Sequence, residues 1–245
     1  MKKVLSNFNR SLFLGFAIIG LALLFTGCMK KGDDVDIPSA GLMTFNLAPD
    51  QQSVVVALSG STVSRTPMGY TSFSGLYQNI FIGTRNVESF DYPDENPLAS
   101  TEFNFENDKY YSAFVVGVNG SYRNVVALDN FDSLSSTSGN AYIRYINAIT
   151  DTVNNPSVTI SAGGSNVVND NAAYASVSEF TAVAPGEVSI AVKSGTAIDA
   201  NRTITVEAKK VYTVLLVGMP GETDEFKKVQ IRFIQNGTLT DEGGK

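Results

Sequence analysis

The chain has 245 residues, 43% of them apolar, and a formal net charge of −6. It contains no histidine, no tryptophan and one cysteine, which excludes Ser-His-Asp and Cys-His catalytic sites and zinc sites built from His and Cys. Because an acidic surface repels phosphate backbones, we expect no nucleic-acid partner.

The first 28 residues have the organisation of a secretory signal that ends in a cysteine. Three basic residues precede an apolar run from Leu12 to Phe25, which leads into Thr26-Gly27-Cys28. A membrane-spanning helix needs about 20 apolar residues, and this run is shorter. Residues 1–27 are therefore predicted to be a cleaved signal peptide. The alternative is an uncleaved membrane anchor that carries a buried thiol.

The end of this segment resembles a bacterial lipobox, in the relaxed form, here with Phe25, that is typical of the Bacteroidetes. The resemblance implies that Cys28 is lipidated and becomes the N-terminus of the mature protein. A lipid anchor of two or more acyl chains holds a protein firmly to a bilayer. We therefore expect attachment to the outer membrane, on either its periplasmic or its cell-surface face.

Polar segments divide the remaining chain. We expect a lipidated tether at residues 28–39, a first repeat at 40–131, a Ser-rich linker at 132–140, a second repeat at 141–237 and a polar tail at 238–245. Without residues 1–27, which hold three basic and no acidic residues, 15 basic residues face 24 acidic ones, a net charge of −9. This spread-out charge favours solubility.

The two repeats are predicted from matching segments. Residues 110–117 match 211–218 at an offset of 101, residues 43–48 match 143–148 at 100, and residues 69–74 match 173–178 at 104. Offsets that stay this constant indicate a duplicated unit, so we expect each repeat to have its own core. Residues 139–238 are then expected to fold alone.

Each repeat is predicted to be all-β. In the second, strands are expected at residues 141–148, 157–162, 175–181, 187–193, 203–208, 211–218 and 230–235, where β-branched residues alternate with polar ones. About seven strands in about 100 residues is the size of an immunoglobulin-like sandwich. The predicted fold is two tandem immunoglobulin-like β-sandwich domains after a lipoprotein signal peptide. The repeated tyrosines, Tyr70 with Tyr174 and Tyr111 with Tyr212, are assigned to the fold.

The second repeat resembles the domain-of-unknown-function family numbered 4397. The matching segments are 144–148 (RYINA), 184–186 (APG) and 210–218 (KVYTVLLVG), and the first repeat fits more loosely. The family is common in bacterial lipoproteins and has no established activity. The resemblance therefore implies a fold and a cellular location, but no biochemical activity.

Three groups of residues are candidate sites. Asp91, Asp94 and Glu95 gather carboxylates that could bind calcium, although a solvated loop is the alternative. Ser133 and Thr152 each follow an Asp in a pattern that resembles O-glycosylation sites of the Bacteroidetes; the alternative is turn capping by that Asp. The unrepeated Tyr77, Tyr92 and Tyr122 are candidate ligand contacts.

These observations predict a non-catalytic, lipid-anchored cell-envelope protein with an interaction or structural role. Its expected partners are the membrane, through the N-terminal lipid, and an envelope protein or glycan. No cofactor and no catalytic residue are expected. The alternatives are a glycan-binding module of a nutrient-uptake system and a pilus-type surface subunit.

Overall fold

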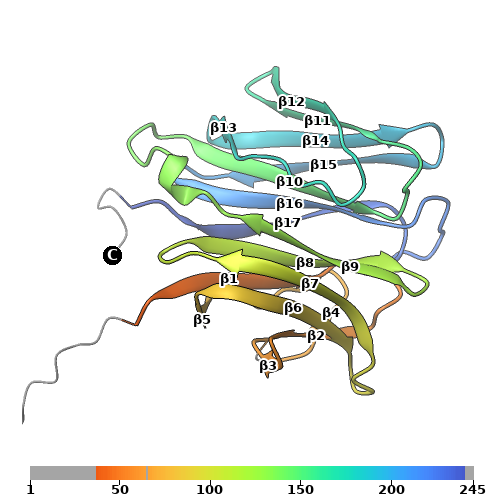
Figure 1. The fold of residues 1–245 in the computed structure, drawn as a ribbon. Helices are drawn as coiled ribbons and strands as arrows, with labels where there is room; N and C mark the ends of the chain where they lie inside the picture. The colour runs from red at the N-terminus through yellow and green to blue at the C-terminus, as the bar shows by residue number, and fades with distance from the viewer. Residues whose placement is uncertain (1–36, 65, 241–245) are drawn as a thin grey trace, which may run out of the picture. The chain divides into compact units, whose positions relative to one another are not determined.

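The structure is a computed structural model that describes residues 37–64 and 66–240, and its strands form four sheets (Figure 1). The predicted signal peptide, Cys28 and most of the predicted tether lie outside these residues. The predicted all-β fold with sandwich domains in tandem is confirmed.

The first sandwich is built from residues 39–128. One sheet has the strand order β5-β1-β8-β9 and the other β3-β2-β6-β7, with β4 beside β2. The strands are β1 Ser39–Asn46, β2 Ser53–Leu58, β3 Ser61–Thr62, β4 Met68–Gly69, β5 Gln78–Phe81, β6 Gly83–Asp91, β7 Pro97–Phe105, β8 Tyr110–Val118 and β9 Ser121–Leu128. Side chains from both sheets meet in a core that includes Leu42, Val56 and Tyr111.

The second sandwich follows the same plan. Its sheets have the orders β13-β10-β16-β17 and β12-β11-β14-β15. The strands are β10 Ala141–Ile149, β11 Ser157–Ala162, β12 Ser165–Asn171, β13 Thr181–Val183, β14 Gly186–Ser194, β15 Ile198–Val206, β16 Lys210–Gly218 and β17 Gln230–Thr238. Its core includes Ile143, Ile190 and Tyr212. Tyr111 and Tyr212 are both buried, and each hydroxyl accepts a hydrogen bond from a backbone N–H five residues upstream.

Three details of the predicted second repeat are wrong. The strand expected at residues 203–208 is β15, Ile198–Val206, which begins five residues earlier. Residues 175–181 do not form a strand, because Ala175 has a φ of 61° and the Ser176 N–H donates to the Ala173 carbonyl, which closes a turn. A strand begins only at Thr181. The sequence prediction also missed β12, whose mostly polar residues hide the alternation typical of strands.

A parallel strand pair lies at the centre of each repeat. β1 pairs with β8, and β10 pairs with β16, both in parallel register. Nearly every residue of these four strands is buried. Strands covered on both faces read as continuous apolar runs instead of alternating patterns. One face of each pair packs into its own sandwich, so the other face must pack against something else.

That second face forms a third core between the two sandwiches. In Figure 1 the four sheets stack as layers, and β8 and β9 of the first sandwich lie beside β16 and β17 of the second. Met43, Phe45, Leu47, Phe114, Val116, Ile146, Ala148, Leu215, Val217 and Ile234 are the buried members of this core. Both repeats contribute to it. The sandwiches therefore share a hydrophobic core at their interface.

The duplication extends to single hydrogen bonds. Asn46 and Asn147 are both fully buried, and each side chain accepts from the backbone N–H two residues later. The structural offset at β1 and β10 is therefore 101, not the 100 inferred from sequence. Gly117 and Gly218 also correspond, with φ of 133° and 114°, and at each the next strand passes too close for a Cβ atom.

The connecting segment is tied to the second sandwich. It begins with a short 3-10 helix, η2 Phe131–Ser133. The Tyr142 hydroxyl accepts from the Ser135 N–H at 2.9 Å and donates to the Ser135 carbonyl at 3.0 Å. At the other end, β17 runs through Thr238, one residue beyond the predicted boundary. The Leu239 N–H donates to the Lys209 carbonyl at 2.7 Å.

Candidate functional site

A buried ion pair joins the two repeats beside the third core. The Arg144 guanidinium on β10 lies 2.5 Å from the Asp129 carboxylate, which follows β9, and both side chains are at most 2% exposed. The Ser112 hydroxyl donates to Asp129 and accepts from Arg144, at 2.7 and 3.0 Å. Arg144 also donates to the Thr213 hydroxyl and stacks on the Phe180 ring at 4.4 Å. Arg144 thus connects Asp129 and Ser112 of the first repeat to its own neighbours in the second.

Tyr77 extends this network. Its hydroxyl donates to Asp129, and Asn236 of the second repeat donates to it at 3.1 Å. Burial, with the Asp129 charge as the next cause, raises the pKa of Tyr77 well above its usual value. The hydroxyl therefore stays protonated and acts as a structural donor. Sequence reasoning placed Tyr77 among the ligand contacts, but its hydroxyl serves the junction between the repeats.

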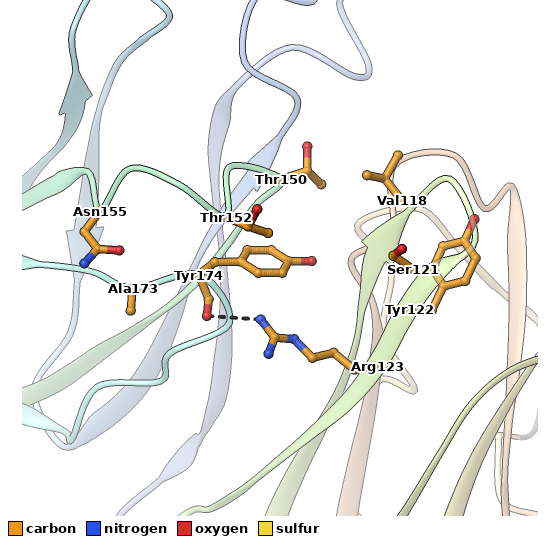
Figure 2. A pocket seen from close by; sticks show the side chains of 9 residues that line it. All are labelled: Val118, Ser121, Tyr122, Arg123, Thr150, Thr152, Asn155, Ala173 and Tyr174. Atoms are coloured by element: carbon orange, nitrogen blue, oxygen red, sulfur yellow. Dashed lines mark hydrogen bonds between the residues drawn. The ribbon is translucent and has the colours of Figure 1, made fainter.

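A hollow of about 570 Å³ opens at the same junction (Figure 2). The first repeat contributes the turn between β8 and β9 and the start of β9, and the second contributes the segments after β10 and before β13. The lining residues are Val118, Ser121, Tyr122, Arg123, Thr150, Thr152, Asn155, Ala173 and Tyr174. Its size lies within the range of small-ligand sites in proteins.

Arg123 and Tyr174 form the base of this hollow. The guanidinium lies over the Tyr174 ring at 4.6 Å and donates to the Tyr174 carbonyl at 3.3 Å. Figure 2 shows the ring pointing across the hollow, with Arg123 on one side of it and Thr150 and Thr152 on the other. Arg123 is exposed and forms no ion pair within the described part of the chain.

Tyr122 forms the opposite wall. Its hydroxyl donates to Asp50 and accepts from Gln51, both at 2.7 Å. Burial, followed by the hydrogen bond to Asp50, raises the Tyr122 pKa. Asp50 also accepts from the Asn119 N–H at 2.7 Å, so its charge is held beside the wall instead of lining the hollow. The Tyr122 ring is thereby fixed in place.

A second hollow, of about 490 Å³, lies near Tyr77 at another part of the junction. Tyr77, Tyr110 and Phe131 meet edge to face or tilted, with centroids 5.1 to 5.8 Å apart. Leu239 and Thr240 also line it. The chain's own C-terminal segment therefore occupies one side of this hollow.

The structure separates the three predicted ligand-contact tyrosines. Tyr122 lines the first hollow and Tyr77 the second, whereas Tyr92 is 49% exposed and lines neither. Tyr92 begins the turn between β6 and β7, where its N–H donates to the Ser53 carbonyl at 3.0 Å. The predicted set is therefore not one site.

The carboxylates proposed for calcium lie in the same β6–β7 turn. The Asp91 side chain accepts from the Asn96 N–H at 2.6 Å and from its side-chain amide at 3.0 Å, so it caps the turn. Asp94 and Glu95 are exposed. Among residues 37–64 and 66–240, no three His, Cys, Asp or Glu side chains are grouped so that they could hold a metal ion.

Both predicted O-glycosylation residues are exposed. Ser133 ends the 3-10 helix, and its hydroxyl donates to the Asn130 carbonyl at 2.8 Å. Thr152 lies on the rim of the first hollow, next to Asp151, which caps the turn by accepting from the Val153 and Asn154 N–H groups. The hydrogen bonds from Asn154, followed by the one from the Val153 N–H, lower the pKa of Asp151. Modification of either hydroxyl stays a prediction.

The first hollow is the better candidate site because seven of its nine lining residues carry polar side-chain groups, whereas the charges of the buried network pair with each other. Its chemistry suits reversible binding: hydroxyls, an amide, phenol rings and one cation. Sequence reasoning missed Arg123 and assigned Tyr174 to the fold as a repeated residue. The one available signal in the sequence was that Arg123 directly follows Tyr122, a predicted ligand contact.

Comparison with known proteins identifies a family and little more. The sequence model of the domain of unknown function (DUF4397) matches residues 40–154 and again 141–238. No curated protein matches the chain. Within the described ranges, no helix has the length and apolarity that crossing a membrane requires.

Two similar solved structures are crystal structures of proteins described as candidate cell adhesion proteins. The one from Parabacteroides distasonis ATCC 8503 is 8% identical with a TM-score of 0.25, covering 82% of this chain and 100% of that one. The one from Bacteroides eggerthii DSM 20697 is 12% identical with a TM-score of 0.23, covering 84% and 98%. At such low scores the likeness supports no conclusion about function.

Proposed function

Because the chain belongs to the DUF4397 family, two copies of which span residues 40–154 and 141–238, we propose that it is a non-catalytic cell-envelope protein with a binding or structural role. The observation that best supports this role is the buried network between the repeats. The most deeply buried charges among the described residues are those of Asp129 and Arg144. They form an ion pair that joins the two sandwiches. An acid–base site needs such groups at a surface that a substrate can reach.

A rigid body with variable loops suits binding. The third core and the ion pair fix the loops of one sandwich relative to those of the other. Loops on a rigid frame can change sequence freely, and binding residues are concentrated there for that reason. The hollow at the junction is lined by loops of the second repeat and by the adjoining ends of β8 and β9 of the first.

We further propose that Cys28 anchors this body to the outer membrane. In cells fed a labelled fatty acid, the unchanged protein should carry label and sediment with membranes. Cys28→Ser should carry none and accumulate as uncleaved precursor, because only the thiol accepts the lipid. Thr26→Ser, a change in the same segment that keeps the cysteine, is the matched control and should be labelled. Labelled Cys28→Ser protein would contradict the anchor.

Glycan binding is a second candidate role, and the hollow favours it. The hydroxyls of Ser121, Thr150 and Thr152 and the amide of Asn155 both donate and accept hydrogen bonds, as sugar hydroxyls do. A pilus-type subunit has no comparable observation in its favour.

A further inference from the structure

We propose that the hollow between the repeats, lined by Tyr122, Arg123 and Tyr174, binds an acidic sugar residue, with Arg123 as the partner of the sugar carboxylate. The inference rests on the proposed binding role of the protein. It does not depend on lipid attachment at Cys28.

The charge of the lining points to an anionic ligand. Arg123 is the only charged residue among the nine that line the hollow, and within the described ranges it has no ion-pair partner. A single guanidinium nitrogen of Arg123 donates to the Tyr174 carbonyl. An arginine fork can bind a carboxylate through two parallel N–H donors. Stacking on Tyr174 holds the fork in place before any ligand arrives.

Two nearby carboxylates have to be weighed against Arg123. Asp50 lies behind Tyr122 and accepts two hydrogen bonds, and Asp151 accepts from the backbone of its own turn. Neither is among the lining residues. Asp151 accepts with both of its oxygens, whereas Asp50 accepts only with Oδ2 and its Oδ1 is buried without a hydrogen-bond partner among the described residues. Arg123 is nevertheless the only charged side chain that lines the hollow itself.

The remaining lining points to a sugar instead of a peptide. Hydroxyl and amide groups surround the opening, and the only aliphatic side chains among the lining residues are Val118 and Ala173. A peptide would need apolar pockets for its side chains or a free strand edge. Sugar rings instead present hydroxyls at their rim and a flat C–H face that packs on aromatic rings, here Tyr122 and Tyr174. A volume of about 570 Å³ accommodates about one to three sugar rings.

The test uses residues 38–245, the compact unit of the structure, and so leaves the membrane anchor out. Binding of methyl glucuronide, methyl glucoside and an acidic peptide is followed by NMR titration. We expect methyl glucuronide to bind. Methyl glucoside should bind at least about tenfold more weakly, because the glucoside cannot form the charge-assisted contact with Arg123.

Two arginine variants distinguish binding in the hollow from a general effect of positive charge on the surface. Arg123→Gln should weaken glucuronide binding about tenfold or more, to the level of the glucoside. Arg202→Gln is the matched control, since Arg202 also stacks on an aromatic ring, Phe233 at 5.0 Å, but lies outside the hollow. It should leave binding unchanged.

Four outcomes would overturn the proposal: no binding of the glucuronide, equal binding of the glucoside, tighter binding of the acidic peptide, or equal losses in the two arginine variants. None of them bears on fatty-acid labelling at Cys28. Failure of this site and failure of the anchoring proposal are therefore distinguishable.

Discussion

At the scale of single residues, the junction depends on a charge in an otherwise apolar strand. Arg144 sits among buried residues along the whole of β10. A charged residue in such a run is rarely buried unless it is paired, so the sequence held a signal for a hidden partner. It could not identify Asp129 as that partner, because Asp129 belongs to the other repeat and to a segment read as the edge of a linker.

We expect Arg144→Met to lower the free energy of unfolding by about 3–5 kcal/mol, because it leaves the buried Asp129 charge without a partner. Removing both charges, in Arg144→Met with Asp129→Leu, should recover a large part of this loss. Denaturant titration of residues 38–245 measures both values.

Lys193→Met is the control for this prediction. Lys193 pairs with Asp199 at 3.5 Å, and both side chains are about 60% exposed, so its loss should change stability little. If Arg144→Met is no more harmful than Lys193→Met, the ion pair does not hold the repeats together.

At the scale of strands, the sequence pattern predicted four of the eight strands of the second repeat, β10, β11, β14 and β16, within one or two residues. It was less informative where tertiary contacts decide. The central strands are buried on both faces, so their unbroken apolar runs, such as Val214–Val217, show no alternation. The offset at β10 was one residue short because apolar residues match each other at either offset. The pairing of β1 with β8 and of β10 with β16, together with the hydrogen bonds of Asn46 and Asn147, gives an offset of 101.

Gly218 is the last residue of β16. We expect Gly218→Ala to lower the free energy of unfolding by about 1–3 kcal/mol. The reasons are its φ of 114° and a Cβ position 2.3 Å from the Lys228 carbonyl oxygen. Gly237→Ala is the control, since its Cβ would meet nothing within 4 Å. Thermal unfolding of the two variants tests this, and equal melting temperatures would show that the chain can relax at Gly218.

At the scale of the whole molecule, the two repeats are not independent domains, because they share a core. The sequence predicted a core in each repeat, and both cores exist. It did not predict the third core, because residues that face a neighbouring domain carry the same apolar pattern as those that face inward. An isolated second repeat would leave Ile146, Leu215 and Arg144 uncovered. The expectation that residues 139–238 fold well alone therefore does not follow from the structure.

The candidate site also belongs to this scale. Neither repeat contains the hollow by itself, since Tyr122 and Arg123 come from one and Tyr174 and Thr152 from the other. Sequence reasoning found two of these four residues, and for unrelated reasons. A site formed across repeats has no local motif, which is why spacing along the chain could not reveal it.

Calorimetric unfolding of residues 38–245 measures whether the two repeats form one cooperative unit. We expect a single transition whose calorimetric enthalpy equals the van't Hoff enthalpy, because the shared core and the buried ion pair couple the sandwiches. Two separate transitions, or a calorimetric enthalpy about twice the van't Hoff value, would show that the sandwiches unfold independently and would contradict this coupling.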